Sequence, residues 1–137
     1  MDTQQFKKLK VNTLPGRSGI MNVLELKDHI DFEVKRVYYI TDITGDTGQH
    51  THHREKELFV MVKGGCTAVI DSGNGLEDVR IESPSDALYV GNYVWHGFKD
   101  FDPDSVLMAL SSTNYIPDRS DYIEDYQEYK DFLKTKE

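Results

Sequence analysis

The chain has 137 residues, 38% of them hydrophobic, and a formal net charge of −8 at neutral pH. This length predicts one domain covering residues 1–137, and no apolar run approaches the roughly 20 residues that a membrane helix needs. The acidic charge excludes nucleic acid as an expected partner, because that binding needs a basic surface. No apolar stretch follows the N-terminal lysines, so we expect no secretory signal and a cytoplasmic protein. The single cysteine, Cys66, excludes an intramolecular disulfide.

Short runs of β-forming residues, separated by turn residues, fill the chain from about residue 20 to residue 113. Runs at this spacing predict an all-β fold of the sandwich or barrel type. Gly64 and Gly65 predict a sharp bend, Ser72–Gly75 predicts a hairpin turn, and the first ten residues carry no clear signal. In chain order, the expected strands cover residues 20–26, 36–43, 58–62, 67–71, 78–82, 88–90, 94–98 and 106–111.

The pattern changes near the C-terminal end of the sequence, where apolar and aromatic residues recur at helical spacing over residues 121–133. We expect a short helix here that packs on the barrel. Its tyrosines, Tyr122, Tyr126 and Tyr129, are interpreted as packing residues and not as ligand contacts.

The segment His50-Thr51-His52 carries the strongest functional signal. Alternate side chains of an extended segment share a face, so both imidazoles should point to one spot while Thr51 points away. Imidazole titrates near neutral pH and also ligates metals. The pair therefore predicts either acid/base chemistry or half of a metal site, and the residues alone leave both open.

The order of His50, His52, Glu57, Gly64 and a later His96 resembles the cupin signature. This resemblance implies a double-stranded β-helix, or jelly-roll, barrel, and the expected strands agree with it. In metal-dependent cupins the corresponding positions bind a metal ion. The alternative function is therefore a metal-dependent cupin enzyme that uses His50, His52, Glu57 and His96.

A second resemblance covers nearly the whole chain. The matching segments are residues 33–40, Gly48-x-His50-x-His52, Ser83-Pro84, residues 88–91, 94–96 and 104–106, and residues 121–126. Together these segments resemble the cupin-type dTDP-sugar 3,4-ketoisomerases, a WxcM-like family. The resemblance implies an isomerase that converts dTDP-4-keto-6-deoxyglucose to a dTDP-3-keto-6-deoxyhexose. It also implies a homodimer that exchanges N-terminal strands, no cofactor, and a role in making deoxyamino sugars for lipopolysaccharide and other surface glycans.

The resemblance assigns roles to individual residues. His52 would transfer the proton at carbon, through an enediol, and His50 would be its partner. Arg36 shares a strand face with Tyr38 and could reach a phosphate. The expected substrate-binding residues are Arg36, Tyr38, Arg17, Trp95, His96 and Arg54, with Arg17 or Arg54 replacing an arginine that the family has at Thr47.

Glu57 departs from the family, which has glutamine at this position. A glutamate here either orients a histidine by a hydrogen bond or completes a metal site, and the sequence leaves both possibilities open. A third possibility is a sugar-binding cupin without catalysis, although a pure binder has no special need for a pair of titrating groups.

Overall fold

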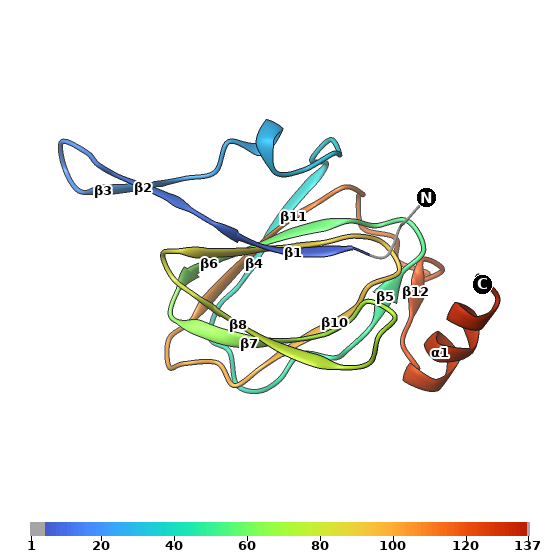
Figure 1. Cartoon of the computed structure of the whole chain (residues 1–137). Coiled ribbons are helices and arrows are strands. Elements are labelled where there is room, and N and C mark those ends of the chain that lie inside the picture. Colours follow the sequence, from blue (N-terminus) through green and yellow to red (C-terminus); the bar gives the residue numbers. More distant parts are fainter. Residues whose placement is uncertain (1–4, 137) are drawn as a thin grey trace.

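A computed structural model describes residues 5–136 and contains two antiparallel sheets that face each other and curl into a barrel (Figure 1). One sheet has the order β1-β9-β6-β11-β4 and the other β10-β7-β8. The larger sheet comprises β1 (Phe6–Lys10), β9 (Asp86–Val90), β6 (Glu57–Lys63), β11 (Val106–Ser111) and β4 (Arg36–Ile40). The smaller sheet comprises β10 (Trp95–Lys99), β7 (Gly65–Asp71) and β8 (Glu77–Glu82). The expectation of an all-β jelly-roll barrel is confirmed.

The core lies between the two sheets and follows from the two-residue period of the strands. In β11, for example, Leu107 and Ala109 are buried while their neighbours are only partly so. Alternation of this kind directs one side of each strand into the barrel. The inward side chains include Phe59, Met61, Cys66, Ile70, Ile81, Leu88 and Val90. Cys66 is thus a packing residue.

The predicted turns occur where the glycines stand. Gly64 has a φ of 75° and links β6 to β7, and a side chain there would collide with Ser105. Glycine adopts this left-handed conformation without steric cost. Gly73 and Gly75 also have positive φ and lie in the turn that joins the paired strands β7 and β8, as expected for a hairpin.

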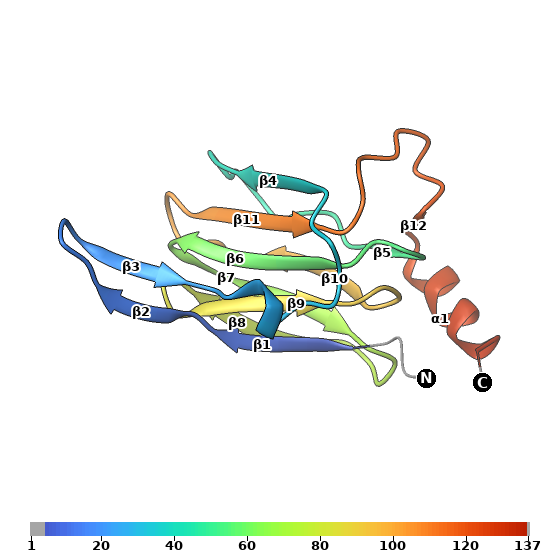
Figure 2. The ribbon, with the colours of Figure 1, turned by 90° about the horizontal axis from the view of Figure 1, so that it is seen from above.

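The N-terminal part differs from the sequence prediction. β1 was not predicted, because only Leu9 of its five residues is buried and the strand is fixed by its pairing with β9. The strand expected over residues 20–26 ends at Val23, and a 3-10 turn, η1 (Leu26–Asp28), follows. β3 (Ile20–Val23) pairs instead with β2 (Asn12–Pro15), and this hairpin projects from the barrel (Figure 2).

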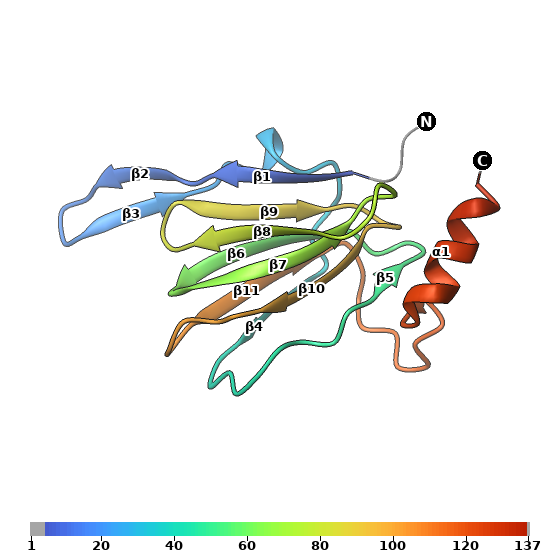
Figure 3. The same ribbon diagram turned by 60° about the horizontal axis from the view of Figure 1, so that its bottom comes forward.

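The C-terminal part completes one end of the barrel. β5 (Thr51–His52) pairs with β12 (Tyr122–Ile123), and α1 (Tyr126–Lys134) follows and lies beside this end (Figure 3). The helix begins later than expected because Asp125 is extended and its side chain accepts a hydrogen bond from the Glu128 backbone N–H, at 2.9 Å. Tyr129 packs α1 onto the barrel as expected. Among residues 5–136, no helix is both long and apolar enough to cross a membrane.

Candidate active site

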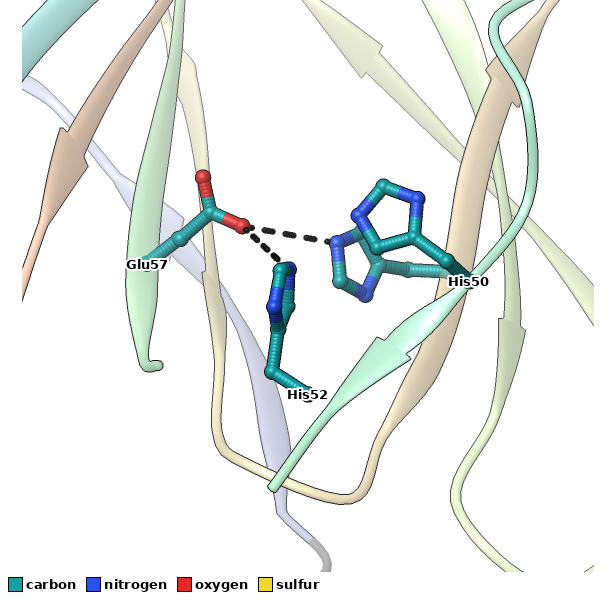
Figure 4. Close-up of side chains that lie close together, drawn as sticks. His50, His52 and Glu57 are labelled. Atoms are coloured by element: carbon teal, nitrogen blue, oxygen red, sulfur yellow. Dashed lines mark ion pairs between the residues drawn. The ribbon is translucent and has the colours of Figure 1, made fainter. Parts of the chain in front are cut away.

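The two histidines of the opening motif share a face, as predicted. His50 forms an isolated β-bridge with His96, with backbone N–H to carbonyl distances of 3.0 and 2.9 Å, and His52 lies in β5. Thr51 points the other way, where its hydroxyl donates to the Val94 carbonyl at 2.8 Å. The ring centroids of His50 and His52 are 4.8 Å apart. Figure 4 shows both rings and Glu57 directed toward one another.

Glu57 is the centre of this cluster. It stands at the start of β6, and its Oε1 lies 3.5 Å from Nε2 of His52 and 3.6 Å from Nε2 of His96. The Tyr38 hydroxyl donates to its Oε2 at 2.5 Å. Glu57 therefore connects residues of three strands through one buried carboxylate.

Two further carboxylates face the other side of the His52 ring. Oδ2 of Asp121 lies 3.3 Å from Nδ1 of His52, and Oε1 of Glu55 lies 3.4 Å from the same nitrogen. These are ion-pair distances, and within residues 5–136 neither nitrogen of the ring makes an aligned hydrogen bond. His52 is thus enclosed by three buried acidic groups, namely Glu55, Glu57 and Asp121.

This environment separates the proton affinities of the two histidines. Burial lowers the pKa of His50 to about 2, with the neighbouring His96 and His52 acting in the same direction. Burial by itself also lowers the pKa of His52, but Glu57, Glu55 and Asp121 together outweigh it and leave that pKa raised. His50 is therefore the neutral member of the pair, and His52 is the stronger base.

The acidic groups respond to the same contacts. Burial opposes ionisation of Glu57, but the neighbouring imidazoles of His52 and His96 outweigh it and lower the pKa of this carboxylate. Burial and the nearby charge of Glu57 raise the pKa of Glu55. Burial, followed by the charge of Glu57, raises the pKa of Tyr38, which consequently stays a hydrogen-bond donor. Glu57 is therefore the permanent anion of the cluster.

The His pair opens onto a pocket of about 480 Å³. A hollow of this size is typical of small-molecule sites. Tyr38 and His50 also line a smaller adjoining cavity of about 100 Å³, to which His96 and apolar side chains contribute. The larger pocket is lined by Arg36, Tyr38, His50, His52, Glu55, Glu57, Tyr115 and Tyr122.

Three of the expected substrate-binding residues lie at these cavities, namely Arg36, Tyr38 and His96. Nη2 of Arg36 donates to Glu55 at 2.8 Å, and the guanidinium lies over the ring of Tyr38, 5.3 Å from its centroid. Nε of Arg36 is buried and has no hydrogen-bond partner among residues 5–136. This nitrogen is a free donor beside the pocket.

The other three expected contacts are not brought to the pocket. Trp95 precedes His96 on β10 and so faces the opposite side, where it packs against Tyr129 of α1. The Arg54 side chain is 69% exposed and pairs with Asp121. Arg17 lies in the exposed turn of the β2–β3 hairpin, away from the barrel end that holds the His pair. Within one chain these three residues line neither cavity.

Tyr122 corrects the sequence prediction. It was expected to pack as part of the helix, but it lies in β12 with its ring centroid 4.4 Å from that of His52 and 5.1 Å from that of His50. Glu55, Asp121 and Tyr115 were also missed. The matching segment 121–126 contained Asp121 and Tyr122, but the helical spacing of the later tyrosines concealed their extended conformation.

The alternative metal-ligand set also comes together. One ligand atom from each of His50, His52, Glu57 and His96 lies within 4.8 Å of the others, and the same holds for His52, Glu55 and Asp121. The donor types suit a divalent transition metal. Geometry alone therefore does not separate the acid/base reading from the metal reading.

Comparison with known proteins bears on this choice. Residues 4–134 match the protein family described as "FdtA: WxcM-like, C-terminal". The chain is 38% identical, over 130 residues, to the TDP-4-oxo-6-deoxy-alpha-D-glucose-3,4-oxoisomerase of Aneurinibacillus thermoaerophilus. That alignment covers 93% of this chain and 88% of the relative. The relatives are isomerases, which does not favour the metal-dependent alternative.

Solved structures agree in fold and in activity class. A 3,4-ketoisomerase from Helicobacter canadensis superimposes with a TM-score of 0.83 at 29% identity, over 94% of this chain and 97% of that one. A His-to-Asn variant of the 3,4-ketoisomerase QdtA from Thermoanaerobacterium thermosaccharolyticum, in complex with TDP-4-keto-6-deoxyglucose, also has a TM-score of 0.83. Its identity is 28%, and the match covers 95% of this chain and 94% of that one.

Proposed function

The chain belongs to the family described as FdtA (WxcM-like, C-terminal) and is a sugar-nucleotide 3,4-ketoisomerase; we propose that its substrate is TDP-4-keto-6-deoxyglucose. The observation that carries this proposal is the His50–His52 pair, one with a lowered and one with a raised pKa, at the wall of a substrate-sized pocket. Its product would be a 3-keto-6-deoxyhexose for deoxyamino-sugar synthesis.

His52 is the group suited to proton transfer at the sugar carbons. Isomerisation removes the proton from C3, which the 4-ketone acidifies, and returns a proton to C4 after an enediol. His52 accepts the C3 proton, and Glu55, Glu57 and Asp121 stabilise the imidazolium that forms. The N–H hydrogen of this imidazolium exchanges with solvent, and the imidazolium then delivers a proton to C4. No electrons leave the sugar, so no external oxidant is required.

His50 is the group suited to proton transfer between the sugar oxygens. While the carbon proton moves, the C4 oxygen must gain a proton and the C3 hydroxyl must lose one. Because its pKa is lowered to about 2, His50 stays neutral and offers both an N–H donor and a lone pair. A neutral imidazole can therefore carry the proton from one oxygen to the other without a long-lived charge.

The Arg36 guanidinium supplies a place for the anionic part of the substrate. Arg36 lines the larger pocket, and its guanidinium already holds Glu55 through Nη2. A guanidinium presents several donors in a fixed plane, so it can bind a phosphate oxygen and retain its carboxylate partner. We assign the diphosphate to this side of the pocket.

Deuterium exchange tests the activity directly. Metal-stripped protein is incubated with TDP-4-keto-6-deoxyglucose in heavy water, and the sugar is followed by NMR. We expect a new ketosugar that carries deuterium at C4. The absence of both product and deuterium would exclude this substrate, whereas activity that returns only with added metal would support the alternative reading.

Substitution of the carbon base tests the role of His52. His52→Ala should lower kcat by about 1000-fold, since general acid/base groups contribute roughly 10²- to 10⁴-fold. His53→Ala is the matched control, because His53 faces the other side of the strand and contacts Tyr93 and Phe132. The control should keep kcat within about threefold. Near-normal turnover in His52→Ala would remove the assigned base.

We also propose a homodimer in which the β2–β3 hairpin reaches the partner. The hairpin carries exposed apolar side chains, with Ile20 70% and Met21 55% exposed, which a monomer has little reason to display. A second apolar set, including Val37 and Tyr39, is exposed on β4 of the larger sheet. Docking one set on the other in a symmetric pair would cover both. It would also carry Arg17 to the partner, where it could contact substrate.

Mixed dimers test this arrangement. An Arg17→Ala chain and a His52→Ala chain are co-expressed with different tags, and the mixed dimers are isolated. If Arg17 serves the partner's site, each mixed dimer has one intact site, and about half of the wild-type activity per dimer returns. Activity is measured at a substrate concentration well below KM, where loss of Arg17 is visible. If Arg17 acts within its own chain, neither site of the mixed dimer has both groups and activity does not return. If Arg17 has no role, the Arg17→Ala homodimer is already as active as the wild type, and this control would contradict the arrangement. A monomer by light scattering would exclude the dimer itself.

A further inference from the structure

Tyr122 lies next to both histidines of the candidate site. It is directly opposite His52 in the pairing of β12 with β5, and cross-strand partners project from the same face of a sheet. Its ring centroid is 4.4 Å from that of His52 and 5.1 Å from that of His50. The next residue, Ile123, is buried in the cluster that contains Tyr129 of α1. A sugar that reaches both imidazoles therefore also meets the ring of Tyr122.

The ring of Tyr122 is held in place by its neighbours. The Arg119 guanidinium lies over it, with Cζ 4.0 Å from the ring centroid. Glu124 holds this guanidinium through two contacts, at 2.6 Å from Nη2 and 3.3 Å from Nε. The Tyr122 backbone N–H donates to the Arg119 carbonyl at 3.0 Å, and the His53 backbone N–H donates to the Asp121 carbonyl at 2.8 Å. The orientation of the ring is thus set by the chain itself.

The hydroxyl of Tyr122 is a donor without a partner in the chain. Of the three tyrosines that line the larger pocket, Tyr38 donates to Glu57 at 2.5 Å, and Tyr115 is 56% exposed to solvent. Tyr122 is only partly buried, and within residues 5–136 its hydroxyl makes no hydrogen bond. A phenol, with an ordinary pKa of about 10, keeps its proton at neutral pH. Tyr122 therefore brings a neutral O–H donor to the pocket.

We propose that Tyr122 is a catalytic residue whose hydroxyl donates a hydrogen bond to the C4 oxygen of the sugar as negative charge develops there. This inference rests on the proposed function. Removal of the C3 proton moves electrons onto the C4 oxygen, and a donor already fixed in place stabilises that charge. Tyr122 keeps its own proton throughout, so proton transfer stays with His50 and His52.

The other polar groups of the pocket are less suited to this role. Glu55 and Glu57 are carboxylates, and a carboxylate anion repels a developing negative charge. Arg36 is paired with Glu55 at 2.8 Å and serves the diphosphate in the proposed function. Tyr115 lies against Arg36, whose Cζ is 5.7 Å from its ring centroid. Tyr122 is the tyrosine whose ring contacts the histidines and whose hydroxyl is available.

Tyr122→Phe tests the proposal, because it removes the hydroxyl and keeps the ring that packs on Arg119. We expect kcat to fall about 100-fold, as when one donor to a developing oxyanion is lost, with KM within about threefold. Tyr126→Phe is the matched control: the Tyr126 hydroxyl donates to Asp71 at 2.6 Å, and Tyr126 lines neither cavity. The control should keep kcat within about threefold. A similarly small change in Tyr122→Phe would overturn the proposal.

A binding measurement tests the same contact without turnover. ¹³C NMR of tyrosine Cζ is recorded on His52→Ala protein, which should hold the ketosugar without converting it. The Tyr122 signal is assigned by its absence from the His52→Ala/Tyr122→Phe variant. We expect this signal to shift when TDP-4-keto-6-deoxyglucose binds and to stay in place when TDP alone binds. No shift with the ketosugar, or an equal shift with TDP alone, would contradict a hydrogen bond to the sugar.

The proposed function and the role of Tyr122 can fail separately. If the wild-type protein does not convert the ketosugar, the proposed function fails, and the Cζ signal still decides whether Tyr122 contacts the sugar. If the wild type is active and Tyr122→Phe keeps its kcat, only the role of Tyr122 fails. A ketosugar that does not bind overturns both. Loss of kcat in Tyr122→Phe, together with a shift specific to the ketosugar, supports both.

Discussion

The C-terminal part of the chain packs against the barrel, whereas the hairpin near the N-terminal end projects from it. Near the C-terminal end, Asp121, Ile123 and Tyr129 are buried, and they attach β12 and α1 to the barrel beside the His pair. The β2–β3 hairpin near the N-terminal end has no buried residue and extends away from the barrel (Figure 2). One end therefore completes the site of its own chain, whereas the side chains of the hairpin are left exposed in a single chain.

The largest expected difference between the two regions is in how much a substitution lowers the free energy of unfolding. Tyr129 is fully buried in α1, and its hydroxyl lies 2.6 Å from the Tyr93 carbonyl and 3.0 Å from that of Asp71. Tyr129→Ala should lower the free energy of unfolding by about 3–5 kcal/mol, as for other buried aromatic residues. Met21→Ala in the hairpin should change it by less than about 0.5 kcal/mol in the monomer. Urea denaturation at low protein concentration measures both, and equal losses would contradict the comparison.

A smaller effect concerns pH, because the C-terminal segment helps to bury His50. The folded pKa of His50 is lowered to about 2 from 6.5, so below pH 6.5 only the unfolded chain binds this proton. Stability should therefore fall with acidification, by up to about 1.4 kcal/mol per pH unit for one proton. His50→Gln should remove this part of the loss between pH 7 and about pH 5. If the stability of the wild type and of His50→Gln changed with pH in the same way, this prediction would be contradicted.

His52 affects the pH dependence of stability in the opposite direction, so a His52 variant is the control for the His50 experiment. Its pKa is raised on folding, so its stabilising contribution is complete below pH 6.5 and is lost as the pH rises through the folded pKa. His52→Gln should therefore lose stability relative to wild type mainly on the acid side. The two variants should diverge as the pH falls, as followed by thermal unfolding.

The smallest effect falls on the hairpin. Arg17→Ala should raise KM about tenfold, the loss of roughly 1.4 kcal/mol for one substrate contact, and should leave the melting temperature within 1–2 °C. Steady-state kinetics with Arg17→Lys as the conservative variant measure it. An unchanged KM would leave the hairpin as a docking element without a role in the site.

The sequence predicted the barrel well because strands that bury one face leave a two-residue pattern. Leu107 and Ala109 in β11 display it, and Gly64 marks the adjoining turn. β1 escaped prediction because its conformation comes from pairing with β9, which is distant in the chain. The same applies to β12, whose two residues are extended only because β5 lies next to them.

The candidate site was predicted where it depends on residues close together in the sequence, and it was missed where it depends on residues far apart. His50 and His52 are two residues apart, so local geometry was enough to place them on one face. Asp121 meets His52 across a separation of 69 positions, and no local pattern encodes that contact. Resemblance named Trp95 as a substrate contact, but alternation along β10 directs it away from His96 and toward α1.

The pairing of β12 with β5 has a consequence for how the protein is made. Tyr122 and Ile123 are opposite His52 and Thr51, so the strand with the His pair waits for a partner that is synthesised much later. At translation rates of about 5–20 residues per second, the ribosome needs several seconds to add the intervening chain. An unfinished chain can have its barrel strands and still have an incomplete site. The complete site can therefore form only after Tyr122 and Ile123 have been synthesised.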